Sequence, residues 1–366
     1  MRSASLLACP WLLYLAPLAL SSTFEAKLFG AMSMALKKIA GQSKTLIIAH
    51  RILDNWRRRR AFKAGNTVTA YGSTHEFWSL EKSVNYINLV HREYIEYSGL
   101  DPEAFRGSRI LEVGPGDNFG VALKFLAGGA AKVVCLDKFY SERNVEQQTR
   151  IYQELRKQLL PDEGRVFDEC ITLDGEIVLN EERLQYIYGH GVEEADQILE
   201  PGSFNFIVSR AVIHNVYDVE RGFESMDRLL TPGGCMLHKI DMSDENMFSS
   251  RGMHPLTFLT IPEPLYYLMA SDSGKPNRKL IGDYRAQVQK RGYESKILIT
   301  AVLGAGPLMA HKEQIEQGVD FGNKTVSLIN EIRPKLATPY RDRSDPELAA
   351  TGIFLVAIKG TKGTEQ

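Results

Sequence analysis

Residues 109–120 read RILEVGPGDNFG, in which a short apolar run breaks into two closely spaced glycines. This order predicts a buried strand, a tight turn and a helix, and glycines in such a turn let a ligand approach the backbone. Phe119 takes the third glycine position of a dinucleotide-binding fingerprint, and the Gly-Lys-Ser/Thr of a P-loop is absent, so neither site is predicted. Asp137 lies 21 residues after Gly116, about the spacing at which a carboxylate binds ribose hydroxyls.

Strand-like and helix-like segments alternate around this turn. Strands are expected at 109–113, 132–136, 184–188, 204–209, 235–240, 293–302 and 353–359. Helices are expected at 80–97, from the glycine turn to 127, at 142–159 and at 219–230, the last closed by Pro232-Gly233-Gly234. The alternation predicts a parallel sheet with helices on both faces. Segments 242–284 and 303–350 interrupt it, and we expect lid-like insertions there, at the edge of the sheet where ligands bind.

The composition limits the class of protein. The 366 residues include 44 basic and 45 acidic side chains, with 44% hydrophobic and 24% charged residues. These values suit a globular protein and exclude a collagen-like, wholly disordered or disulfide-scaffold chain. The four cysteines are far apart and form no C-x-x-C pair, so no structural metal site is predicted.

The balanced charge conceals a basic N-terminal extension at residues 1–66, which carries eleven basic and two acidic residues. Its apolar run at 6–20 is shorter than the roughly 20 residues of a membrane span. This extension could be an anchor, a cleaved signal or a packed helix, and we expect it to meet an anionic membrane surface on the cytoplasmic side. Nucleic acid is disfavoured, because the remaining domain, 67–366, is acidic.

Several stretches together resemble the class I S-adenosylmethionine-dependent methyltransferases over about 105–302 and 351–360. The matching segments are ILEVGPG at 110–116, the strand ending in Asp137, FNFIVSRAVIHNV at 204–216, RLLTPGGCMLHKID at 228–241, GYESKILIT at 292–300 and GIFLVAIK at 352–359. HNVYDVERGF at 214–223 is similar to uncharacterised bacterial small-molecule methyltransferases. The resemblance implies a Rossmann-like α/β fold, with a seven-stranded, mostly parallel sheet and an antiparallel last strand.

The same resemblance implies an S-adenosyl-L-methionine site. Glu112 would hold the amino end of the cofactor, Gly114 and Gly116 would let the backbone pass against it, and Asp137 would accept both ribose hydroxyls. The other cofactor-binding positions implied by the family are Lys138, His190, Ser209 and Arg210. His190 stands where the family often has an acidic residue near adenine.

For the chemistry, His214 after the fourth strand is the candidate general base, although a purely structural histidine is equally compatible with the pattern. Candidate substrate contacts are Asp241, Tyr266 and Arg278. No Asn-Pro-Pro-Tyr or Pro-Cys motif is present, which disfavours base and amide methylation. We therefore expect methyl transfer to a small-molecule or lipid-like acceptor, at oxygen. The alternative is a catalytically silent cofactor-binding or scaffold protein at the membrane surface.

Overall fold

The computed structural model describes residues 43–69, 72 and 74–361. The apolar run at 6–20 and most of the predicted extension lie outside the described residues. The chain divides into two compact units, 1–47 and 48–366, and apart from the start of α2 (Lys44–Lys63) all elements below belong to the second. Within the described part of the chain, no helix is both long and apolar enough to cross a membrane.

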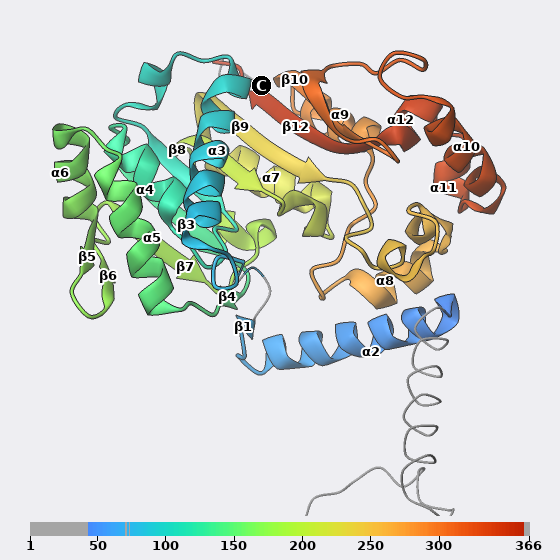
Figure 1. Cartoon of the computed structure of the whole chain (residues 1–366), viewed down its shortest axis with the longest axis horizontal. Coiled ribbons are helices and arrows are strands. Elements are labelled where there is room, and N and C mark those ends of the chain that lie inside the picture. The colour runs from blue at the N-terminus through green and yellow to red at the C-terminus, as the bar shows by residue number, and fades with distance from the viewer. Residues whose placement is uncertain (1–42, 70–71, 73, 362–366) are drawn as a thin grey trace, which may run out of the picture. The chain divides into compact units, whose positions relative to one another are not determined.

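The main sheet has eight strands in the order β11-β10-β12-β9-β8-β2-β3-β7 (Figure 1). Their bounds are β2 (Arg109–Val113), β3 (Lys132–Asp137), β7 (Leu184–Tyr188), β8 (Phe204–Arg210), β9 (Leu230–Asp241), β10 (Glu294–Val302), β11 (Gly306–Lys312) and β12 (Ala350–Ile358). Strands β7, β3, β2, β8 and β9 are parallel, and β12 runs antiparallel between β9 and β10. The Rossmann-like fold and its antiparallel last strand are thus confirmed. The sheet has one strand more than the seven that were predicted, because β11 adds an antiparallel strand beyond β10.

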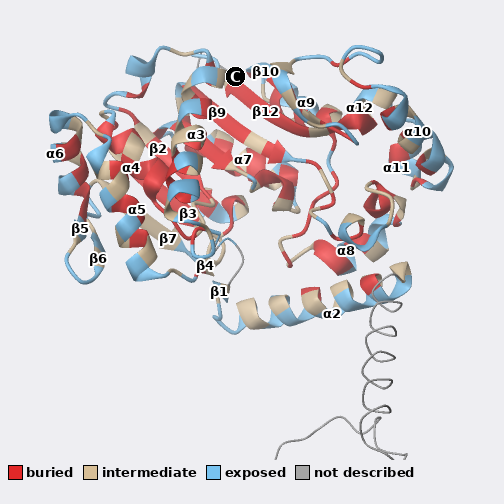
Figure 2. Ribbon diagram, viewed as in Figure 1, coloured by how far each residue is buried: buried red, intermediate tan, exposed pale blue. Residues whose placement is uncertain are grey.

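Helices cover both faces of this sheet. On one face lie α3 (Leu80–Ser98), α4 (Gly120–Ala127), α5 (Val145–Lys157) and α6 (Pro161–Cys170), whose apolar side chains share one core with the sheet. Leu237 of β9 belongs to that core, whereas the next residue, His238, faces Phe223 of α7 (Val219–Leu229) on the opposite face. Figure 2 shows the buried residues concentrated along the sheet and the inner sides of the helices.

The helix boundaries follow from local chemistry. The Ser79 side chain accepts a hydrogen bond from the Lys82 N–H at the start of α3, and Gly99 ends the helix with a φ of 70°. The predicted stop at 232–234 is displaced, because α7 already ends at Leu229. Gly233 instead adopts a φ of 77° within β9, where the pairing with β8 changes register.

The two irregular segments contain short elements rather than long loops. Segment 242–284 holds η4 (Ser249–Arg251), η5 (Thr257–Thr260), α8 (Glu263–Ala270) and the start of α9 (Ile281–Lys290). Segment 303–350 holds β11, α10 (Asn323–Ile332), η6 (Arg333–Lys335), α11 (Thr338–Arg341) and α12 (Asp345–Ala349). Two small two-stranded sheets lie outside the main sheet: β1 (Val68–Thr69) pairs with β4 (Tyr140–Ser141), and β5 (Ile171–Leu173) pairs with β6 (Ile177–Leu179). The described fold also contains three short 3₁₀ helices, η1 (Pro102–Phe105), η2 (Val192–Gln197) and η3 (Ile213–Asn215).

Candidate active site

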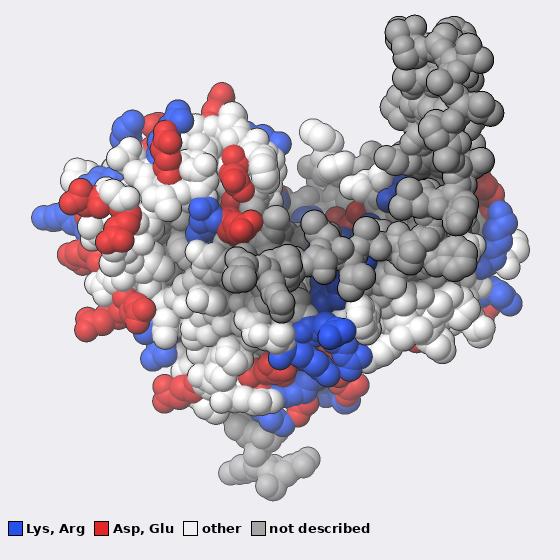
Figure 3. Space-filling model, turned by 90° about the horizontal axis from the view of Figure 1, so that it is seen from below, with Lys and Arg blue, Asp and Glu red and all other residues white. Residues whose placement is uncertain are grey.

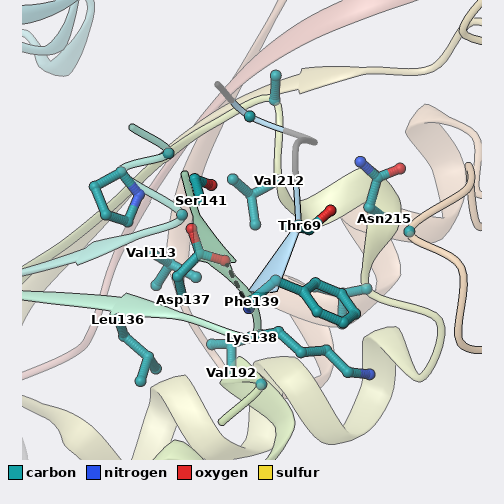
Figure 4. Close-up of a pocket in the computed structure, with 18 of the residues that line it drawn as sticks. Thr69, Val113, Leu136, Asp137, Lys138, Phe139, Ser141, Val192, Val212 and Asn215 are labelled. Atoms are coloured by element: carbon teal, nitrogen blue, oxygen red, sulfur yellow. Dashed lines mark hydrogen bonds between the residues drawn. The ribbon is translucent and has the colours of Figure 1, made fainter. Parts of the chain in front are cut away.

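A cavity of about 430 Å³ opens at the carboxyl ends of β2, β3 and β8. This size falls within the usual range for small-molecule sites. The glycine turn after β2, the end of β3 and the loop after β8 form its inner walls, as the close-up in Figure 4 shows. Further wall residues come from α2, from 271–274 and from Thr69, Gly72, Thr74 and His75. The cavity therefore lies where open α/β sheets bind ligands.

The glycine turn requires glycine at two positions. Gly114 has a φ of 72°, and a Cβ added there would lie 2.2 Å from Cγ2 of Val212. Gly116 has a φ of 67°, and its added Cβ would lie 2.9 Å from the Gly72 carbonyl oxygen. Both conformations are unfavourable for residues with a side chain. Only glycine therefore keeps this turn in close contact with the neighbouring segments.

Asp137 ends β3 with its carboxyl group at the cavity wall, beside Lys138 and Phe139 (Figure 4). One carboxylate oxygen accepts a hydrogen bond from the Phe139 N–H at 3.2 Å. Burial raises the pKa of this carboxyl to about 6, although backbone N–H groups and the charge of Arg143 act in the opposite direction. Asp137 can thus accept hydrogen bonds from a ligand at neutral pH.

Arg143 is a site residue that the sequence reasoning missed. Its Nη2 donates to the Gly116 carbonyl oxygen at 3.0 Å. Its guanidinium carbon lies 4.5 Å from the ring centroid of Phe119 and 4.4 Å from that of Tyr186. Such cation–π contacts hold a planar cation in place. Arg143 thereby fixes the glycine turn and supplies positive charge near Asp137.

Glu112 lies behind the wall rather than in it. Its carboxyl group is buried, and the Cys135 thiol is 3.6 Å from one of its oxygens. Burial raises the pKa of Glu112 to about 7. Asp117, a cavity residue at the end of the turn, accepts a hydrogen bond from the Glu76 N–H at 3.1 Å, and burial raises its pKa to about 6.

The structure brings most, but not all, of the predicted cofactor residues to the cavity. Its walls include Gly114, Gly116, Asp137, Lys138, His190 and Arg210. Glu112 and Ser209 are not among the wall residues, and the Ser209 hydroxyl instead pairs with Nδ1 of His238 at 2.8 Å. Arg210 forms an ion pair with Glu93, and its Nε donates to the Tyr86 hydroxyl at 3.2 Å.

His214 does not reach the cavity itself but contacts a residue that does. Its side chain is 2% exposed, and Nε2 lies 2.5 Å from Oε1 of Glu245, which lines the cavity. Burial alone would raise the pKa of Glu245, but the hydrogen bond and charge of His214, with Lys275, hold it below its usual value. Glu245 is therefore an ionised carboxylate at the cavity wall, backed by a histidine.

The loop around Glu245 is held in an unusual conformation. Glu245 has a φ of 46° and Asn246 a φ of 61°. The buried Asp244 carboxylate accepts hydrogen bonds from the backbone N–H groups of Asn246, Phe248 and Ser249. Left-handed backbone at residues other than glycine persists where surrounding contacts enforce it, and it is concentrated at functional sites.

The three predicted substrate residues lie outside this cavity. Tyr266 is fully buried, and its hydroxyl donates to the Pro276 carbonyl oxygen at 2.7 Å. Arg278 is 2% exposed; it donates to the Phe258 and Ile261 carbonyl oxygens and pairs with Glu263. Asp241 accepts a hydrogen bond from the Ser243 N–H at 2.8 Å and caps the turn after β9. None of the three lines the cavity, because Tyr266 and Arg278 are buried among other residues and the exposed Asp241 caps a turn.

The residues missed from the sequence reach the cavity from distant segments. They include Arg58, His75, Tyr86, Glu245 and the stretch 271–274. Burial lowers the pKa of His75 to about 4, so its ring is neutral at physiological pH. Of these residues, only Glu245 could have been predicted from the sequence, because it is an acidic residue close after the fifth strand, at the edge of the sheet where ligands bind.

Comparison with protein families gives one match, to a family described as a methyltransferase domain, over residues 86–294. The matched region contains the glycine turn, Asp137, His214 and Glu245. No curated protein matches the sequence.

Among solved structures, phosphoethanolamine N-methyltransferase 2 of Haemonchus contortus, in complex with S-adenosyl-L-methionine, is 15% identical with a TM-score of 0.38. The match covers 74% of this chain and 52% of that one, so the chain spans about half the length of that enzyme. An S-adenosylmethionine-dependent methyltransferase of Mesorhizobium loti is 15% identical with a TM-score of 0.36, over 77% of this chain and all of that one. Because these TM-scores are low, the assignment of the chain to a family rests on the match to the methyltransferase domain and not on the solved structures.

Proposed function

The chain belongs to the class I S-adenosylmethionine-dependent methyltransferases, and we propose that it methylates an oxygen atom of a small-molecule or lipid-like acceptor. The single observation that carries the acceptor chemistry is the Glu245 carboxylate, which lines the cavity with His214 2.5 Å behind it. A carboxylate at that place can accept the proton that an acceptor hydroxyl loses.

The cavity residues fit the cofactor of this family. The glycine turn offers backbone without side chains, and the Asp137 carboxylate offers several lone pairs to paired ribose hydroxyls. Arg143 would keep the glycine turn in place through its bond to the Gly116 carbonyl oxygen. When bound, S-adenosylmethionine supplies a methyl group already activated as a sulfonium.

The remaining task of the protein is to orient the acceptor and to move a proton. Glu245 would accept the hydroxyl proton as the oxygen forms its bond to the methyl group, and His214 would stabilise Glu245 by hydrogen bonding. A cavity of about 430 Å³ leaves little room beside a cofactor, so the acceptor would insert only a small hydroxyl-bearing group. This suits a small molecule or the head group of a lipid.

The test uses the full-length protein with methyl-labelled S-adenosylmethionine and a panel of hydroxyl-bearing small molecules and lipids. Glu245→Gln should lower kcat by about 10²–10⁴-fold while the cofactor Kd stays unchanged, because only the proton acceptor is lost. Glu313→Gln, which changes an exposed carboxylate outside the cavity, is the matched control. Equal loss in both variants, or none in either, would refute the role of Glu245.

The alternative of a catalytically silent protein makes a different prediction in the same experiment. Cofactor binding would then be weakened by Asp137→Ala, yet no acceptor on the panel would be methylated. We also propose that the protein works on the cytoplasmic side, at an anionic membrane surface met by residues 1–66.

A further inference from the structure

The described part of α2 has an outer face that combines apolar and basic side chains. Leu53 and Trp56 are each 53% exposed. Together with Arg57 and Arg60 they follow the i, i+3, i+4, i+7 spacing of one helical face. The Arg60 guanidinium carbon lies 5.1 Å from the Trp56 ring centroid.

The cations of this face lack acidic partners. Within the part of the chain that the structure describes, Arg57, Arg59, Arg60 and Lys63 form no ion pair, whereas Arg51 pairs with Asp54. All four are exposed. On the side of the molecule where α2 lies in Figure 1, lysine and arginine side chains gather in a dense patch (Figure 3). An unneutralised cluster of this kind favours an anionic partner.

The inner side of α2 is attached to the domain beside the cavity. Asn55 donates from Nδ2 to the Ser271 hydroxyl at 3.0 Å, and its Oδ1 accepts from the Asp272 N–H at 2.8 Å. The Phe62 ring packs edge-on against Phe139, with centroids 5.6 Å apart. Ser271, Asp272 and Phe139 all line the cavity. The orientation of α2 is therefore fixed, with its basic and apolar face turned outward.

We propose that this outer face, formed by Leu53, Trp56, Arg57, Arg60 and Lys63, docks on a bilayer that contains anionic lipids. Leu53 and Trp56 would enter the head-group layer, where a tryptophan is favoured, and the cations would pair with lipid phosphates. An RNA would use the cations but gain nothing from the exposed Leu53. Docking is independent of the methyl-transfer reaction, and it brings Asn55 and the wall residues Ser271 and Asp272, to which Asn55 is hydrogen-bonded, close to the membrane.

The test is flotation of the full-length protein with two kinds of vesicle, phosphatidylcholine alone and phosphatidylcholine with about one-third phosphatidylglycerol. We expect binding only to the anionic vesicles, weakened by salt. Each cation near such a surface contributes roughly fivefold, so Arg57→Gln/Arg60→Gln/Lys63→Gln should bind about one-hundred-fold more weakly. Trp56→Ser should also weaken binding.

The matched control, Arg150→Gln/Arg285→Gln/Lys296→Gln, removes three exposed cations elsewhere on the domain and should bind like the wild type. Calorimetric titration with S-adenosylmethionine checks that every variant is folded. Undiminished binding of the first triple variant would overturn the proposal by assigning attachment to another segment, such as the apolar run at 6–20. Absence of vesicle binding, or binding of an RNA oligonucleotide alone, would overturn it as well.

Discussion

Replacement of Gly114 by alanine should damage both the fold and cofactor binding. The residue has a φ of 72°, and the new Cβ would lie 2.2 Å from Cγ2 and 3.1 Å from Cγ1 of Val212. Left-handed backbone costs a residue with a side chain roughly 1–2 kcal/mol. Overpacking against a fixed neighbour adds about 1–3 kcal/mol. We expect the free energy of unfolding to fall by roughly 2–5 kcal/mol.

Gly107 separates the two contributions. Its φ is 69°, nearly that of Gly114, yet nothing lies within 4 Å of an added Cβ. Gly107→Ala should therefore lower the free energy of unfolding by only about 1–2 kcal/mol, the backbone share, and leave the cofactor Kd unchanged. Gly114→Ala should raise that Kd at least tenfold, about 1.4 kcal/mol, because the turn must shift away from Val212.

Urea denaturation and calorimetric titration with S-adenosylmethionine measure the two effects. In the double variant Gly114→Ala/Val212→Ala both Cγ atoms are absent, so the loss of stability should be smaller than the sum of the single losses. If Gly114→Ala matched Gly107→Ala in both stability and Kd, the close approach of the turn to Val212 would have no energetic role. The cofactor wall would then not depend on glycine at position 114.

Three further outcomes follow from the charged groups around the turn. Protonation of Asp137, whose pKa burial raises to about 6, should raise the cofactor Kd up to tenfold per pH unit below pH 6, and Asp137→Asn should flatten that profile in calorimetric titration. Burial raises the pKa of Glu112 to about 7, so its ionised form opposes folding. The free energy of unfolding of the wild type should therefore fall as the pH rises from the unfolded-state pKa of this carboxyl towards 7. In urea denaturation, Glu112→Gln should be more stable than the wild type by about 3 kcal/mol at pH 8 and hardly more stable at pH 4. Arg143→Met removes the bond to the Gly116 carbonyl oxygen and a positive charge near Asp137, so the pH profile of cofactor binding should move upward and the Kd at pH 7 should rise about tenfold.

The sheet could be predicted from the sequence because its strands are buried on both faces. Runs such as KVVCLD at β3 read as continuous apolar segments, which is typical of parallel strands between helices. β11 lacks that signal, since it pairs only along one edge and none of its residues is buried, Met309 being completely exposed. An edge strand of this kind is specified by its partner rather than by its own pattern.

The candidate site divides in the same way. Gly114, Gly116 and Asp137 could be predicted because contiguous residues at the ends of adjacent strands make the turn and the wall. Glu245 depends on a left-handed loop held by Asp244, and Arg143 depends on aromatic rings that come from three separate segments. Those arrangements arise from tertiary contacts: the place of Glu245 close after the fifth strand indicates the edge of the sheet where it lies, but not that its side chain lines the cavity.

The origin of the cavity walls indicates where acceptor selectivity is built. The glycine turn and Asp137 lie within the family match, which begins at residue 86, whereas Arg58 and His75 precede it. An activated methyl group is the same for every acceptor, so discrimination between acceptors must come from walls other than those that hold the cofactor. Asn55 of α2 is hydrogen-bonded to segment 271–272, which lies in the insertion that also carries Glu245. Lys275 of the same insertion lies 3.9 Å from Glu245, so we expect acceptor selectivity to depend on α2 and on this insertion together.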